Sequence, residues 1–136
     1  MRSFESDRLH QSDSERRAQA ARLEHVFELQ LRAASPALAA ALSGGEAPVP
    51  VIIGAILALA DGSADHPAIT AFDRLRERGR ATPRHDAVLG HALMAALKEG
   101  LGARFDEAAR EAWANGYIRL VEAVMARRRN RMDFVA

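Results

Sequence analysis

Apolar side chains recur at helical spacing along most of the chain, and prolines and glycines separate one such stretch from the next. The first strong stretch begins at Ser12 and Glu15, which have the spacing of a capping box, and it stops before Pro36. Its apolar stripe consists of Leu23, Phe27, Leu31 and Ala34. The pattern predicts a helix over 12–34, preceded by a polar segment over 1–11 that forms at most a weak first helix.

More helical segments follow, and most of them start at a proline or a capping residue and stop at a glycine or before a loop. Their predicted ranges are 36–42, 49–60, 67–79, 83–100 and 106–131, the last ending in the basic run of Arg127 to Arg131. The segment over 49–60 is apolar on nearly all sides, so we expect it to lie buried at the centre. We interpret 127–136 as a basic tail that follows a domain over 12–126.

The composition agrees with an all-α protein of one domain. Aromatic residues make up only 5% of the 136 residues, while alanine, leucine, arginine and glutamate dominate, which favours helix over sheet. A chain of this length suits a single hydrophobic core. Because the formal net charge is only +1, we expect neither a nucleic-acid partner nor a membrane partner.

Several classes of chemistry have no support in the sequence. Cysteine is absent, which excludes disulfides, zinc–thiolate sites and iron–sulfur clusters. The longest apolar stretch, Ala47 to Ala60, is shorter than the ~18–20 residues needed to cross a bilayer, so a soluble, cytoplasmic protein is expected. Phosphate-binding loops, nucleophile triads and metal-ligand motifs are also missing. The sequence therefore predicts that the protein is not an enzyme.

The last third of the chain carries a set of features in a fixed order. They are the packing pattern of Val88 to Gly90, the helix end at Leu97 to Gly102, and Ala112-Trp113 followed by Tyr117. Over 88–125 the chain resembles the last two helices of bacterial single-domain globins and of flavohaemoglobin head domains, and 26–38 resembles the second helix and proline-led turn of that family. The resemblance implies a bacterial protein with a globin-like fold of six to seven helices.

In that family a haem lies between two helices, which correspond here to 49–60 and 67–78, and a histidine of the second helix binds the iron. The position of this histidine falls on Arg76, and a guanidinium group cannot bind iron because it stays protonated. Two aromatic positions beside the haem fall on Leu42 and Glu28. The resemblance therefore implies a degenerate haem site, and we expect no cofactor.

The side chains expected to line the altered pocket come from several of the predicted helices. They are Glu28, Leu42, Val49, Ile53, Ile56, Phe72, Arg76 and Leu93. Arg76 and Glu28 allow two interpretations: a buried ion pair that fills the vacated cavity, or an Arg76 that belongs to a solvated face with the neighbouring arginines. If haem is bound after all, His66 and His85, which flank the altered helix, are the alternative iron ligands.

The sequence leaves three functions open. The first is a haem-free sensing or protein-interaction module, whose partner is an unknown protein or a small apolar ligand. Small residues over 109–125 allow close helix approach, so a homodimer through the last two helices is one form of this function. The alternative is a haem protein that binds oxygen or another gas through non-standard axial ligation. A nucleic-acid adaptor that uses the run of Arg127 to Arg131 is a third, less supported hypothesis.

Overall fold

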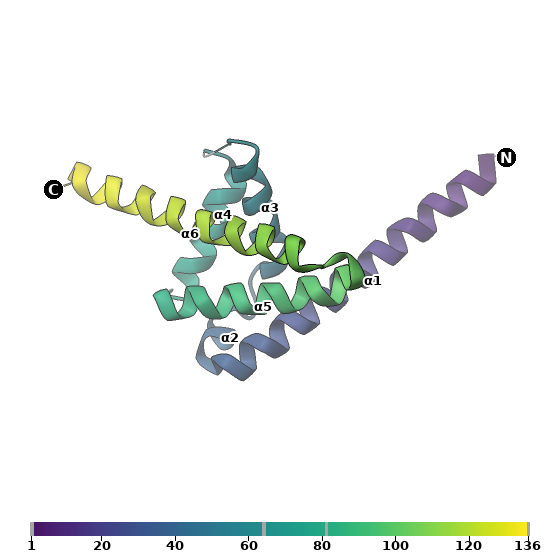
Figure 1. The fold of residues 1–136 in the computed structure, drawn as a ribbon, viewed down its shortest axis with the longest axis horizontal. Coiled ribbons are helices and arrows are strands. Elements are labelled where there is room, and N and C mark those ends of the chain that lie inside the picture. The colour runs from purple at the N-terminus through teal and green to yellow at the C-terminus, as the bar shows by residue number, and fades with distance from the viewer. Residues whose placement is uncertain (1, 64, 81, 136) are drawn as a thin grey trace.

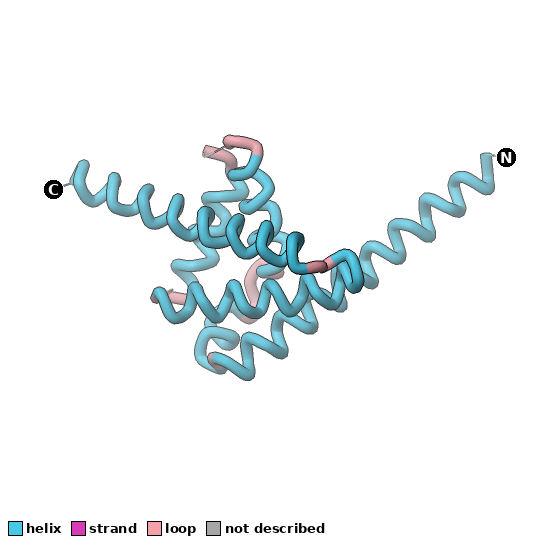
Figure 2. Tube along the Cα trace, viewed as in Figure 1, coloured by secondary structure: helices cyan, strands magenta, loops and turns pink. Residues whose placement is uncertain are grey.

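The computed structural model describes the backbone of residues 2–63, 65–80 and 82–135, and within these ranges the side chains between 17 and 130. Six α-helices and one 3-10 helix form the described chain, which contains no strand (Figures 1 and 2). The helices are α1 Arg2–Ala34, α2 Pro36–Leu42, α3 Pro48–Ala60, α4 Pro67–Arg78, α5 Pro83–Leu101, η1 Gly102–Arg104 and α6 Glu107–Val135. The protein is therefore all-α, as predicted.

Most helices start at the prolines and capping residues that the sequence shows. Proline occupies the first turn of α2, α3, α4 and α5. The side-chain oxygens of Ser35 and Thr82 accept hydrogen bonds from the backbone N–H three residues later, at 3.3 and 3.2 Å. At the start of α6, Asp106 Oδ1 accepts a hydrogen bond from the backbone N–H of Ala109 at 2.8 Å. These caps confirm the predicted starts of α2, α5 and α6.

The two terminal helices are longer than the sequence analysis predicts. α1 continues through Ser12 without a break, because no proline or glycine interrupts residues 2–34. The last helix was predicted to include the basic run and end at Arg131, and α6 continues to Val135. Figure 1 shows the N-terminal end of α1 and the C-terminal end of α6 projecting from opposite sides of the helical body. The predicted helix start at Ser12 therefore lies inside a continuous helix, and the basic run belongs to the last helix, as predicted.

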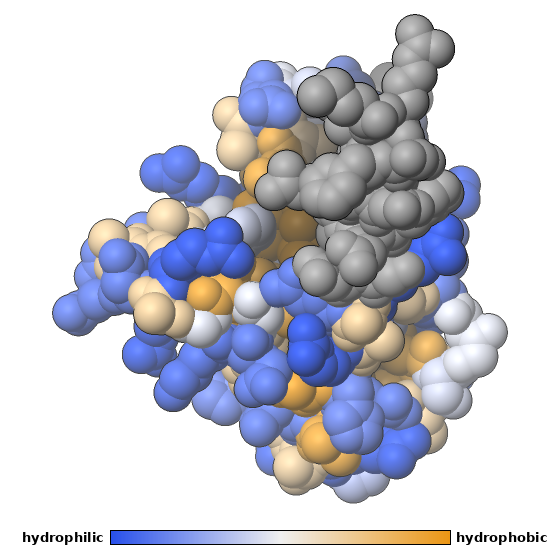
Figure 3. Space-filling model, turned by 90° about the vertical axis from the view of Figure 1, so that its right-hand side faces the viewer, coloured by the Kyte–Doolittle hydropathy of each residue, from blue (hydrophilic) through white to orange (hydrophobic). Residues whose placement is uncertain are grey.

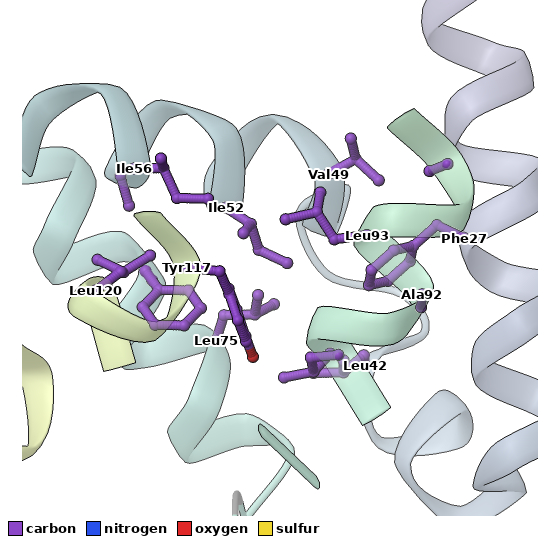
Figure 4. Close-up of a cluster of buried hydrophobic side chains, with 14 of the residues drawn as sticks. Phe27, Leu42, Val49, Ile52, Ile56, Leu75, Ala92, Leu93, Tyr117 and Leu120 are labelled. Carbon is purple, nitrogen blue, oxygen red and sulfur yellow. The ribbon is translucent and has the colours of Figure 1, made fainter. Parts of the chain in front are cut away.

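The helices enclose one apolar core. α1 packs extensively along α5, α3 packs against α4, and α6 contacts both α3 and α5. The largest fully buried side chains are Phe27, Leu38, Ile52, Ile69, Phe72, Leu89, Leu93, Leu120 and Val124 (Figure 4 labels several of them). Ile52 of α3 is completely buried, but Leu57 is 52% exposed. Only one face of α3 therefore packs against the core, and the other face reaches the surface. Figure 3 shows that apolar side chains also reach the surface between polar ones.

A carboxylate from α1 holds the start of α3 in place. α3 has no capping side chain at its own N-cap residue, Ala47. Instead, Oε1 of Glu24 accepts a hydrogen bond from the backbone N–H of Val49 at 2.8 Å. Burial raises the pKa of Glu24 and the charge of Glu28 raises it further, while the hydrogen bond from Val49 lowers it. This contact ties two helices that are far apart in the sequence.

Candidate functional site

A buried ion pair lies where α4 ends and α5 begins. Nε and Nη2 of Arg76 donate hydrogen bonds to the two carboxylate oxygens of Asp86 at 2.8 and 2.7 Å. Arg76 is only 5% exposed and Asp86 only 7% exposed, so the pair is almost completely removed from water. The bidentate geometry is the strongest arrangement for a guanidinium and a carboxylate. The hydrogen bond to Asp86 raises the pKa of Arg76, which therefore stays charged.

Tyr117 joins α6 to this ion pair. Its hydroxyl group donates a hydrogen bond to the backbone oxygen of Asp86 at 2.6 Å, and its ring meets Phe72 edge to face at 6.2 Å between centroids. Burial raises the pKa of Tyr117 well above its usual range, so the hydroxyl group keeps its proton. A Cβ atom on Gly90 would lie 2.6 Å from the Tyr117 ring, so a glycine is needed there for the ring to approach α5.

The predicted pair between Arg76 and Glu28 is wrong. Glu28 is exposed and accepts a hydrogen bond from Arg32 at 2.6 Å, one turn further along α1. The neighbouring side chain, Phe27, takes the position that faces the core, which turns Glu28 outward. The alternative interpretation, a solvated Arg76, is also wrong because the side chain is buried. Arg76 has the predicted kind of interaction with a different partner, Asp86.

A second set of charges ties α6 to α4. Nε of Arg128 donates a hydrogen bond to Oδ1 of Asp73 at 3.0 Å, and Nη2 of Arg128 lies 3.0 Å from Oε1 of Glu77, an ion-pair distance without hydrogen-bond geometry. Asp73 is 5% exposed, so this contact satisfies a second buried carboxylate. The sequence analysis assigned the basic run to a solvated tail, and it missed that Arg128 has this structural role.

Most of the predicted pocket residues are packed in the core. Exposure is 4% for Leu42, 2% for Val49, 6% for Ile56 and 0% for both Phe72 and Leu93, whereas Ile53 is partly buried. A cavity large enough for haem would also admit water and would leave its lining side chains accessible. Leu42, Val49, Ile56, Phe72 and Leu93 belong to one core cluster, and Ile53 packs against it. Glu28 and Leu42 also line a small hollow of about 210 Å³ between α1, α2 and the start of α3.

The donor atoms near this position do not fit a haem. Arg76, the residue to which the globin resemblance assigns the iron ligand, is held by Asp86. His66 is exposed at the start of α4, where its Nδ1 accepts a hydrogen bond from Ala68 N at 3.0 Å. His85 lies beyond the other end of α4, with its Nδ1 3.3 Å from the backbone oxygen of Arg80. Each imidazole is therefore engaged locally at a helix start, at opposite ends of α4.

The surface between α5 and α6 contains an apolar groove. Its first part, of about 320 Å³, is lined by Asp86, Ala87, Gly90, His91, Met94, Ala114, Tyr117, Ile118, Val121 and Glu122. A second hollow, of about 490 Å³, shares His91 and Met94 with the first and continues towards Phe105. Ile118 is 52% exposed and Met125, further along α6, is 42% exposed. We call these two connected hollows the α5–α6 groove.

Three further observations on the described chain do not add a site. A wider hollow of about 690 Å³ between α3 and α4 has two arginines and two glutamates on its rim, which leaves no net charge to select a ligand. The described residues contain no cluster of three side chains suited to a metal ion. Within the same part of the chain, every helix is too short or too polar to span a membrane.

Comparisons with known proteins identify no relative. No protein-family model matches the chain, and neither a curated protein nor a solved structure matches it. The likeness to globins therefore rests on the sequence motifs alone.

We predict that Arg76→Ala lowers the free energy of unfolding by about 3–5 kcal/mol, because it leaves the buried carboxylate of Asp86 without its partner. Arg74→Ala is the matched control: this arginine lies on the exposed side of the same helix, and its loss should change stability by no more than about 0.5 kcal/mol. Urea denaturation measures both values. Equal free energies of unfolding for the two variants would show that the ion pair does not contribute to stability.

Proposed function

We propose that this chain is a haem-free, helical protein-interaction module that acts as a homodimer through the α5–α6 groove and the adjoining face of α6. The outward face of α6 carries the proposal, because it combines exposed apolar side chains with an acidic end and a basic end. The haem-free part is supported by Arg76, which occupies the position that the globin resemblance assigns to the iron ligand and is held there by Asp86. The proposal contains no catalytic step.

The groove side of α6 has a regular pattern. Its residues recur at intervals of three or four: Glu107, Glu111, Ala114, Ile118, Val121, Met125 and Arg129. This spacing places them on one stripe of the helix, away from Leu120 and Val124, which face the core. The exposed Ile118 and Met125 contribute little to the core of one copy. Covering them with a partner would therefore gain hydrophobic free energy that the monomer lacks.

The charges at the two ends of this stripe, Glu107 and Arg129, fit a second copy in antiparallel orientation. When two α6 helices pair with Ile118 facing Ile118, position 107 of one copy faces position 129 of the other. Glu107 and Arg129 are both exposed and have opposite charges, so each end of the pair brings an acid next to a base. A parallel pair would place like charges together. A twofold axis between antiparallel helices also makes the interface self-complementary, as a closed dimer requires.

The prediction that tests this proposal uses a charge swap. Glu107→Arg and Arg129→Glu should each weaken the dimer, and the double variant should restore it, because the opposite charges face each other again in the symmetric pair. Within one copy the two positions lie 22 residues apart. A helix separates them by about 33 Å, so an intramolecular contact cannot produce the rescue. Sedimentation equilibrium at low salt measures the dimer constants.

A matched pair of apolar variants controls for the contribution of the groove. Ile118 and Leu57 are equally exposed at 52%, but Leu57 lies on α3, outside the groove. Ile118→Asp should abolish the dimer, whereas Leu57→Asp should leave it unchanged. A protein that is monomeric in all forms would contradict the homodimer. An apolar molecule that copurifies with such a monomer would point to ligand binding at the groove instead.

The haem-free part of the proposal has its own prediction. When the protein is produced with haem supplied and then passed through gel filtration, we expect no Soret absorption band to remain with it. A band that survives gel filtration and disappears in His66→Ala or His85→Ala would contradict the proposal and favour a haem protein with non-standard axial ligation. His25→Ala is the control, because this exposed histidine lies on α1.

A further inference from the structure

Three arginines surround a small hollow between the end of α4 and the C-terminal part of α6. Its volume is about 180 Å³, and it is lined by Arg76, Glu77, Arg80 and Arg128. Arg128 comes from α6, so the packing of the helices brings it to residues that lie much earlier in the sequence. Pockets for whole cofactors are larger, so a hollow of this size suits one small charged group. We call it the arginine hollow.

Each guanidinium group of the arginine hollow keeps a donor that a ligand could use. Asp86 takes up Nε and Nη2 of Arg76 and leaves Nη1 as a further donor. Nε of Arg128 bonds to Asp73, while its Nη2 is buried without a hydrogen bond. Arg80 is exposed and forms no ion pair with any side chain that the structure describes. Because a buried donor without a partner is costly, an acceptor that fills the hollow would satisfy it.

The backbone of Arg80 is independent evidence that its side chain has a role. Its φ of 50° lies in the left-handed region, and no other described residue except glycine has a positive φ. The adjacent Gly79 does not take this conformation: its φ is −80°, and a Cβ atom on it would lie 2.7 Å from Cδ1 of Leu38. An arginine in a strained position is explained if its side chain has a function there.

We propose that the arginine hollow binds a phosphate group. A planar guanidinium donates two parallel hydrogen bonds to the oxygens of a phosphate, and one phosphate has enough acceptor atoms for several arginines. The hollow lies between α4 and α6, whereas the α5–α6 groove lies between α5 and α6. The proposed phosphate site is therefore separate from the proposed dimer interface and does not depend on it.

The charges around the arginine hollow favour an anion. Those of 73–86, of 122–129 and of the neighbouring wide hollow are the bases Arg74, Arg76, Arg78, Arg80, Arg84, Arg127, Arg128 and Arg129, and the acids Glu46, Asp73, Glu77, Asp86 and Glu122. The bases exceed the acids by three charges, which attracts anions. The antiparallel dimer would add three acids and one base of the second copy: Asp106, Glu107, Glu111 and Arg110. One excess positive charge would still remain.

The test titrates the full chain with inorganic phosphate near neutral pH and follows the arginine Nε–H signals by NMR, with sodium chloride at equal ionic strength as the reference. Arg80→Gly should bind phosphate roughly tenfold more weakly, because it loses charge-assisted hydrogen bonds. The same variant should unfold at a higher urea concentration, since glycine adopts a positive φ without strain. Glu77→Gln removes the only acid that lines the hollow and should bind phosphate more tightly. Arg22→Ala removes an exposed arginine of α1 and should bind like wild type.

The outcomes decide whether the site exists and where its phosphate comes from. Wild type that shows no saturable binding, or Arg80→Gly that binds as well as Arg22→Ala, would overturn the proposal, because any association would then be with the basic surface in general. If the site is present, a short single-stranded oligodeoxynucleotide is added in competition. Displacement of phosphate with a steep salt dependence supports a site for the phosphate of a nucleic-acid backbone. Phosphate that stays bound supports a site for free phosphate.

Discussion

The bidentate bond between Arg76 and Asp86 determines how the second half of the molecule is assembled. It joins the end of α4 to the first turn of α5, and the backbone oxygen of Asp86 also accepts the hydrogen bond from Tyr117 of α6. Three helices therefore meet at one buried pair of charges. Such a pair contributes little net stability compared with apolar side chains, but neither partner can be lost alone without leaving a buried charge. The ion pair therefore constrains the relative orientation of the three helices more than it adds to the free energy of unfolding.

The same constraint orients the outer face of α6, on which the proposed dimer depends. Tyr117, Leu120 and Val124 face inward, and Arg128 extends the attachment to α4 through Asp73. With one side of the helix fixed in this way, the opposite side holds its apolar row at a defined angle beside α5. A rigid helix face lowers the entropic cost of binding, because few side chains must be ordered on association. An ion pair in the core therefore orients the surface proposed for the dimer.

Local signals in the sequence predicted the helices well. Prolines before α2, α3, α4 and α5, together with the caps Ser35, Thr82 and Asp106, were sufficient because helix starts depend on neighbouring residues. The extension of α1 was missed because the capping-box spacing of Ser12 and Glu15 was interpreted as a helix start. The stretch before Ser12 contains neither proline nor glycine, so the helix continues through it.

The candidate site was less predictable, since it depends on which helix faces meet. The globin resemblance drew attention to Arg76, but no local pattern gives its partner. One sequence feature did point to Asp86. It lies one turn before Leu89 and Gly90 on the buried face of α5, where a carboxylate needs a positively charged or hydrogen-bonding partner. The groove was not predicted, because a hollow between two helices depends on how α5 and α6 pack against each other.

Proton exchange at the Nε–H group of Arg76, followed by nitrogen-15 NMR, tests the central role of the ion pair most directly. A guanidinium that is buried and bonded to Asp86 should exchange its Nε proton far more slowly than the exposed Arg74 on the same helix, and its signal should remain visible at pH 7. An Arg76 signal that exchanges as fast as that of Arg74 would mean that the pair is open to water. In that case the three helices would have to be held by the apolar core alone.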